Sequence, residues 1–69
     1  MSKEQYEELR PHFESINRFN GQGSWTGNNV VFKLYQNITG FETNESCNGC
    51  KAATLKDLYN MINKYEGRL

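Results

Sequence analysis

The chain has 69 residues, of which 36% are hydrophobic, 13% aromatic and 23% charged, and its eight basic residues balance its eight acidic ones. This length allows one domain with a small core over residues 1–69, and the composition is that of a folded protein rather than of a disordered one. Proteins that bind phosphate backbones usually carry a basic excess, so the balanced charge argues against non-specific nucleic-acid binding.

The N-terminal segment, from about residue 3 to residue 19, has the apolar spacing of a helix. Ser2 and Gln5 stand three positions apart, as in a capping box. Pro11 lacks a backbone N–H, and its ring clashes with the preceding turn of a helix. The apolar residues nevertheless keep their phase across the proline, so we predict a helix with a break near Pro11. These apolar residues are Tyr6, Leu9, Phe13, Ile16 and Phe19.

Residues 20–28, with the sequence NGQGSWTGN, are predicted to form a loop because three of them are glycines. Trp25 lies in the middle of this loop, where a large apolar ring must find cover. We expect the ring to fold back over the core. The alternative is an exposed anchor for a partner protein, since tryptophan is favoured at interface hot spots.

A second helix is predicted over about residues 29–39. Asn28 or Asn29 is suited to begin it, and Gly40 stands where a left-handed glycine ends a helix. Val and Phe residues in this segment also favour a strand, but the helical spacing and the terminal glycine outweigh that preference. The apolar positions that repeat with the helical period are Val31, Leu34, Tyr35 and Ile38.

A third helix is predicted over about residues 47–65, with Ser46 as its N-cap. Together the three segments predict a small all-α, three-helix domain with long loops. Its expected core consists of Tyr6, Leu9, Phe13, Ile16, Val31, Leu34, Tyr35, Ile38, Leu55, Leu58, Ile62 and Tyr65.

The two cysteines, Cys47 and Cys50, have the Cys-x-x-Cys spacing and allow three interpretations. At a helix N-terminus this spacing suits a redox dithiol, but the strand that precedes such motifs in thioredoxin-like folds is missing. It also provides half of a zinc site, which His12, a carboxylate or a second chain would have to complete. We favour the third interpretation, in which both thiols are free and turned inward as small apolar side chains. No cofactor is therefore expected.

The sequence does not predict an enzyme or a helix-turn-helix protein. A single histidine, His12, leaves no Ser-His-Asp or Cys-His arrangement with a recognisable third partner. The breaks over residues 20–28 and 40–46 exceed the turn of about three or four residues in a helix-turn-helix. Lys56 and Lys64 of the last helix are offset by Asp57 and Glu66. A small DNA-binding regulator remains an alternative.

Residues 30–65 resemble a pattern in small helical proteins encoded by bacteriophages and prophages of gut-type bacteria. In that pattern, a helix of aliphatic and aromatic residues ends in Tyr-x-x-x-x-Gly, and Cys-x-x-Cys then opens a helix that ends in a tyrosine. The resemblance implies a phage-type accessory protein and assigns no catalytic residue. The matching positions are Leu34, Tyr35, Gly40, Cys47, Cys50, Leu55 and Tyr65.

The function that we predict is non-enzymatic binding to another protein, either a virion or host component or a second copy of the chain. Four aromatic residues fall outside the expected apolar stripes, namely Trp25, Phe32, Phe41 and Tyr59, and they are the candidate binding residues. The alternatives are the DNA-binding regulator and a redox or zinc-sharing module at the cysteines. The N-terminus lacks a signal peptide and no long apolar run is present, so we expect a cytoplasmic or virion-associated protein without a membrane partner.

Overall fold

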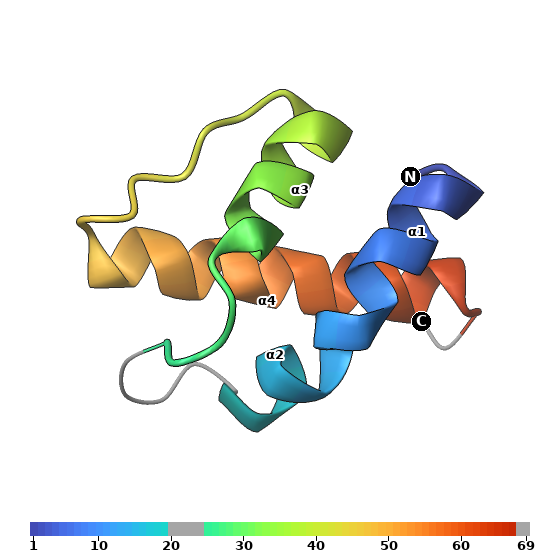
Figure 1. The fold of residues 1–69 in the computed structure, drawn as a ribbon, viewed down its shortest axis with the longest axis horizontal. Coiled ribbons are helices and arrows are strands. Elements are labelled where there is room, and N and C mark those ends of the chain that lie inside the picture. The colour runs from blue at the N-terminus through green and yellow to red at the C-terminus, as the bar shows by residue number, and fades with distance from the viewer. Residues whose placement is uncertain (20–24, 68–69) are drawn as a thin grey trace.

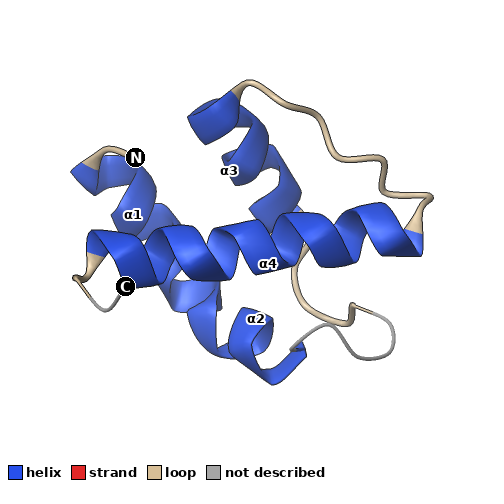
Figure 2. Ribbon diagram, turned by 180° about the vertical axis from the view of Figure 1, so that it is seen from behind, coloured by secondary structure: helices blue, strands red, loops and turns tan. Residues whose placement is uncertain are grey.

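The chain folds into three helical segments, and the first of them is broken, as Figures 1 and 2 show for this computed structural model. The structure describes residues 1–19 and 25–67. The first segment comprises α1 (Lys3–Leu9), the 3-10 turn η1 (Arg10–His12) and α2 (Phe13–Phe19). The others are α3 (Val30–Thr39) and α4 (Asn48–Tyr65), and the described residues contain no strand. The predicted all-α, three-helix fold is confirmed.

The break in the first segment lies at Pro11, within η1. At the start of α1 the Gln5 N–H donates to Ser2 Oγ at 3.2 Å, and the Ser2 N–H donates to Gln5 Oε1 at 2.8 Å, which is the predicted capping box. The flanking residues Leu9 and Phe13 keep right-handed helical backbone angles through the turn. The apolar side chains of α1 and α2 therefore continue on one face of a bent segment.

The boundaries of α3 follow from its polar and glycine neighbours. Asn29 occupies the N-cap position, and the side chain of Asn28 accepts a hydrogen bond of 3.0 Å from the Val30 N–H. At the other end Gly40 has φ of 80°, and its N–H donates to the Gln36 carbonyl at 2.7 Å. Only glycine adopts this left-handed conformation without strain, so the predicted helix end at Gly40 is confirmed.

The long helix α4 is the axis of the fold. It packs against α2 and α3, and α1 packs against α3, so the core lies where these helices meet (Figure 1). Most of the predicted core is confirmed. The buried apolar residues are Leu9, Phe13, Ile16, Val31, Phe32, Leu34, Leu55, Leu58 and Ile62.

The structure corrects the predicted core at several aromatic positions. Phe32 was expected outside the apolar stripe, but it is only 3% exposed, because α3 contacts both α1 and α4 and buries a wider face than one stripe. Tyr65 was expected inside and is 44% exposed at the end of α4. Tyr6, Tyr35 and Ile38 pack against the core while remaining partly exposed.

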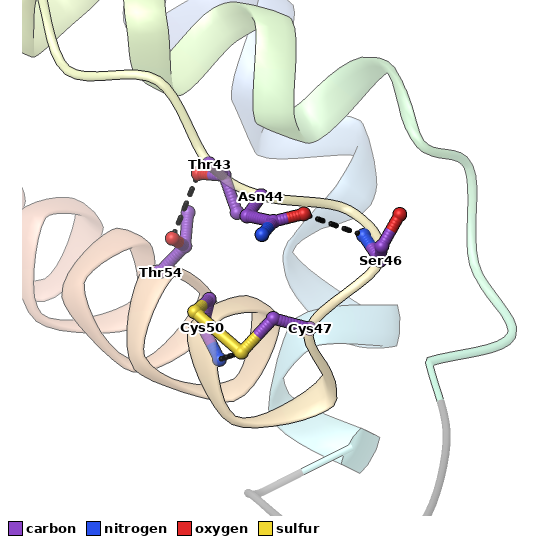
Figure 3. Close-up of a disulfide and its surroundings, with 6 residues drawn as sticks. All are labelled: Thr43, Asn44, Ser46, Cys47, Cys50 and Thr54. Atoms are coloured by element: carbon purple, nitrogen blue, oxygen red, sulfur yellow. Dashed lines mark hydrogen bonds between the residues drawn. A yellow bond between two sulfur atoms is a disulfide. The ribbon is translucent and has the colours of Figure 1, made fainter.

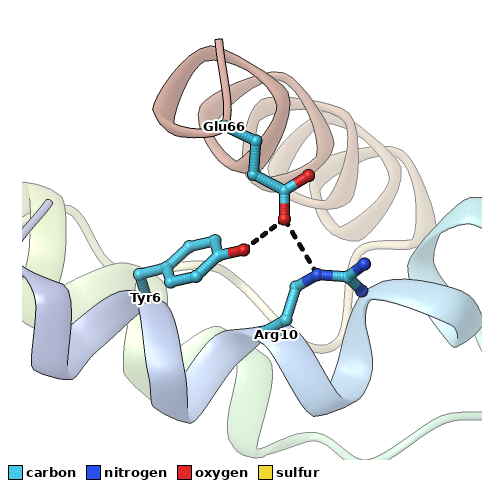
Figure 4. A network of polar contacts seen from close by, with 3 residues as sticks. All are labelled: Tyr6, Arg10 and Glu66. Atoms are coloured by element: carbon cyan, nitrogen blue, oxygen red, sulfur yellow. Dashed lines mark hydrogen bonds and ion pairs between the residues drawn. The ribbon is translucent and has the colours of Figure 1, made fainter. Parts of the chain in front are cut away.

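The first and last helices are joined by a polar contact, shown in Figure 4. The carboxylate oxygen Oε2 of Glu66 accepts a hydrogen bond from the Tyr6 hydroxyl and another, of 2.9 Å, from Arg10 Nε. The Tyr6 ring also stacks on Tyr65, with 4.4 Å between the ring centroids. The hydrogen bond to the Glu66 carboxylate raises the pKa of Tyr6 above 10.0, with smaller contributions from desolvation and from the negative charge of Glu66.

Candidate functional site

An apolar groove of about 440 Å³ lies between α2 and α4. It exists because α4 presents the small side chains of Ala52 and Ala53 at a place where α2 ends in the large ring of Phe19. Two alanines cannot fill the space that larger side chains would occupy. The full lining consists of Ile16, Asn17, Phe19, Ala52, Ala53, Leu55, Lys56, Tyr59 and Asn60.

The apolar lining of the groove is held in place by packing beneath it. Ile16 and Leu55 belong to the buried core. Tyr59 stacks almost parallel on the core ring of Phe13, with 5.4 Å between the centroids. The ring of Phe19 packs edge to face against the ring of Trp25, with 5.9 Å between the centroids. Side chains fixed in this way form a largely preformed surface, so a ligand would not have to order it.

Three polar side chains contribute to the lining, and all three are exposed: Asn17 on α2, and Lys56 and Asn60 on α4. Lys56 is the one charged residue in this lining. The lining contains no His, Cys, Asp or Glu, which are the usual acid–base and nucleophilic groups of active sites. The lining is thus mainly apolar and carries a single positive charge.

The structure does not gather the four predicted binding residues into one surface, although the rings of Trp25 and Phe32 are in contact. Phe32 is buried in the core, where it cannot meet a partner. Phe41 follows α3 and is 69% exposed, outside the groove lining. Tyr59 lines the groove. Of the four residues, Tyr59 is the one that lines this groove.

Trp25 covers the core, as the favoured interpretation of the sequence predicted. Its ring packs edge to face against Phe19 and, at 6.4 Å between centroids, against Phe32. The backbone of Gly27 runs so close to the indole that a Cβ atom at this position would overlap the six-membered ring. A glycine at position 27 therefore lets the backbone approach the Trp25 ring closely. Trp25 itself contributes to the groove indirectly, by packing against Phe19.

Cys47 and Cys50 form a disulfide at the start of α4, shown in Figure 3, with 5.2 Å between their Cα atoms. This corrects the prediction of two free, inward-facing thiols. Cys47 is half-buried and Cys50 is exposed, because the N-terminal end of α4 extends beyond the helices that cover its middle. The apolar stripe of α4 therefore becomes a buried face only from Thr54 onward.

The N-cap of α4 is Cys47 rather than the predicted Ser46. Cys47 has an extended backbone, with φ of −108° and ψ of 110°, and its Sγ accepts a hydrogen bond of 3.1 Å from the Cys50 N–H. Asn44 sets up this start, since its side-chain oxygen accepts from the Ser46 N–H at 3.0 Å and its carbonyl from the Cys47 N–H at 3.0 Å. Ser46 belongs to this local turn, so α4 begins one residue later than predicted and Cys47 becomes its N-cap.

A second contact fixes the segment that leads into the disulfide. The hydroxyls of Thr43 and Thr54 are 2.8 Å apart and share a hydrogen bond, which ties residues 41–47 to the second turn of α4 (Figure 3). Thr54 is buried, and this bond satisfies its hydroxyl. The segment is thus anchored independently of the cysteines.

Within the described part of the chain, no three His, Cys, Asp or Glu side chains gather where they could hold a metal ion. His12 lies in η1 and does not join the cysteines in such a group. Among the same residues, no helix is long and apolar enough to cross a membrane.

No family model, curated protein or solved structure matches the chain. The resemblance of residues 30–65 to phage-encoded proteins therefore stays a prediction. The groove residues Asn17, Ala52, Ala53 and Asn60 were not singled out from the sequence, and Lys56 was considered only for DNA binding. The pair of consecutive alanines was the one sequence signal that could have indicated a gap beside α4.

Proposed function

We propose that the protein works by binding another protein, and that the groove between α2 and α4 is its binding surface. The observation that carries the proposal is the apolar lining of the groove. Core residues contribute to this lining, and Tyr59 and Phe19 add two large aromatic rings. A volume of about 440 Å³ lies within the range of about 300–1,000 Å³ typical of ligand pockets. It is enough for large apolar side chains of a partner.

The partner that fits this groove is an amphipathic helix. The groove runs between two helices, and an amphipathic helix inserts apolar side chains one turn apart into such a surface. Ala52 and Ala53 allow its backbone to approach α4 closely. Asn17 and Asn60 at the exposed part of the lining offer hydrogen-bonding groups beside the apolar contact.

Lys56 adds a preference for negative charge. It is exposed and is the one charged side chain of the lining, so an acidic residue next to the inserted apolar side chains would be attracted to it. The proposed ligand is therefore a helix with large apolar residues at positions three or four apart and Asp or Glu beside them. The resemblance of residues 30–65 to phage-encoded proteins supports a virion or host component as the source of this helix.

A selection experiment tests this proposal without knowledge of the natural partner. The immobilised protein is offered a displayed library of helical peptides in which the apolar spacing and the charge of the flanking positions vary. We expect enrichment of peptides with Leu, Phe or Trp one turn apart and acidic flanks. Ala53→Asp should abolish this enrichment, because it places a carboxylate in the apolar lining. Gln36→Asp, an exposed change on α3, is the matched control and should preserve it.

The charge preference has its own test. With Lys56→Glu the same library should yield peptides with basic flanks, while the apolar spacing should remain. The proposal is wrong if the wild-type protein enriches no apolar spacing, or if Ala53→Asp selects the same peptides as the wild type and Gln36→Asp.

A further inference from the structure

The disulfide at the start of α4 is not used by the groove, and its surroundings are those of a reactive group. We propose that the Cys47–Cys50 pair takes part in thiol–disulfide exchange with dithiols, and that an incoming thiolate attacks Cys50 and releases Cys47. Dithiols here means peptides or proteins that carry two neighbouring cysteines.

Access decides which sulfur is attacked. Cys50 is exposed on the first turn of α4, whereas Cys47 is half-buried at the junction with residues 41–47. Figure 3 shows both sulfur atoms at the end of the helix, beside the linking segment. An attacking thiolate must approach along the axis of the sulfur–sulfur bond from outside, and the exposed Cys50 is the side that leaves room for it.

The hydrogen bonding of Cys47 decides which sulfur leaves. Its Sγ is the N-cap acceptor of an 18-residue helix and already accepts the Cys50 N–H at 3.1 Å. The positive end of the helix dipole and this N–H both stabilise negative charge on that atom. No acidic residue lies in the first turn of α4 to oppose the charge. Cys47 is therefore the better leaving thiolate, and better leaving groups depart faster.

A thiolate of the dithiol forms a bond to Cys50 Sγ, the Cys47–Cys50 bond breaks, and its electron pair goes to Cys47. The second thiolate of the dithiol then attacks the sulfur of its own chain in the mixed disulfide and releases Cys50. The dithiol is oxidised to a disulfide and loses two protons, while Cys47 and Cys50 are reduced and take up two protons from solution.

Reduction should leave the fold intact, which a reversible exchange requires. The cysteines are three positions apart, so their bond closes only a very short loop and restricts the unfolded chain less than a long-range disulfide would. The Thr43–Thr54 hydrogen bond anchors residues 41–47 without help from the sulfurs. We expect the Cys50 N–H, which donates to Cys47 Sγ in the disulfide form, to keep this acceptor after reduction.

The first test compares the whole protein with the hexapeptide SCNGCK, residues 46–51, which has the same cysteines but no long helix. Both are equilibrated with reduced and oxidised glutathione, and the free thiols are counted by alkylation and mass spectrometry. We expect the ratio of dithiol to disulfide to be about tenfold higher in the protein, because α4 stabilises the reduced form. An equal ratio, or a lower one, would overturn the proposal.

The second test identifies the attacked sulfur. Brief treatment of the oxidised protein with reduced glutathione, followed by alkylation and sequencing of the fragment by mass spectrometry, should place glutathione on Cys50 and the alkyl group on Cys47. The single variants provide a spectroscopic check. Thiolate absorbance should appear at lower pH in Cys50→Ser, which retains Cys47, than in Cys47→Ser. Glutathione on Cys47, or the reverse order of the two titrations, would contradict the assigned roles.

Discussion

The Tyr6 hydroxyl donates a hydrogen bond to the carboxylate of Glu66, the C-cap residue directly after α4, across a separation of 60 positions in the chain. Arg10 donates to the same oxygen, so one carboxylate holds two residues of the broken N-terminal segment. The contact matters for the groove because α2 belongs to the same segment. Both contacts lie before α2, so they fix the N-terminal half of the segment against the end of α4.

Glu66→Gln should lower the free energy of unfolding by about 1 kcal/mol, because the amide replaces a charge-assisted acceptor with a weaker one. Urea unfolding followed by circular dichroism measures this change. Glu8→Gln is the matched control, since Glu8 is exposed on α1, and it should change stability by less than about 0.5 kcal/mol. Equal effects of the two substitutions would show that the Glu66 contact contributes nothing specific.

Alkaline pH should weaken the fold through two tyrosines. The pKa of Tyr6 is raised chiefly by its hydrogen bond to Glu66, and the pKa of Tyr35 chiefly by desolvation and then by its hydrogen bond to Asp57. A raised pKa means that the folded protein holds these protons more tightly than the unfolded chain. The resulting stability is fully present below pH 10 and is lost as the pH rises through the higher folded values.

The variant Tyr6→Phe with Tyr35→Phe tests this pH dependence. Its unfolding free energy should fall less steeply above pH 10 than that of the wild type in urea titrations across this range. Tyr65→Phe is the control, because the Tyr65 hydroxyl makes no hydrogen bond among the described residues, and it should keep the wild-type slope. A double variant as steep as the wild type would contradict the account.

Two Gly→Ala substitutions should have opposite effects. Gly27→Ala forces a Cβ atom into the Trp25 ring and should destabilise the fold by about 1–3 kcal/mol with a change in tryptophan fluorescence. Gly49→Ala meets open space in the first turn of α4 and should stabilise it by about 0.5–1 kcal/mol. Thermal unfolding with fluorescence detection measures both. A Gly27→Ala protein as stable as the wild type, with unchanged fluorescence, would show that Trp25 is not held against Gly27.

The two phenylalanines outside the predicted stripes should behave differently. Phe32→Ala removes a buried ring from the core and should cost about 3–5 kcal/mol, enough to unfold a domain of this size. Phe41→Ala removes an exposed ring and should change stability by less than about 0.5 kcal/mol. Circular dichroism of the purified variants separates these outcomes. A folded Phe32→Ala protein with wild-type stability would contradict the placement of Phe32 in the core.

Local features of the sequence predicted the helices well. The Ser2–Gln5 capping box, the break at Pro11 and the glycine end of α3 each depend on residues within a few positions of one another. The apolar period then located most of the core, because a helix that covers a small core buries one face. Phe32 was missed because α3 contacts two helices, and periodicity within one helix does not reveal its number of neighbours.

The candidate sites could not be predicted in the same way, because they depend on how the elements meet. The groove arises where Ala52 and Ala53 of α4 face the end of α2, and no pattern within either helix shows that pairing. The cysteines were expected to be buried because they continue the apolar stripe of α4. That stripe extends past the helices that cover it, and the cap at Cys47 depends on a turn at Asn44 that the sequence pattern did not indicate.

The most direct test of the proposed function is an NMR titration of the isotope-labelled protein with the peptide that the library selection enriches most. Amide shifts should concentrate on Ala52, Ala53, Lys56, Tyr59 and Asn60 of α4 and on residues 16–19 of α2. The Ala53→Asp protein should show none of these shifts at the same peptide concentration. Shifts confined to α3 or to the surroundings of Phe41, with the groove unaffected, would contradict the assignment of the groove as the binding surface.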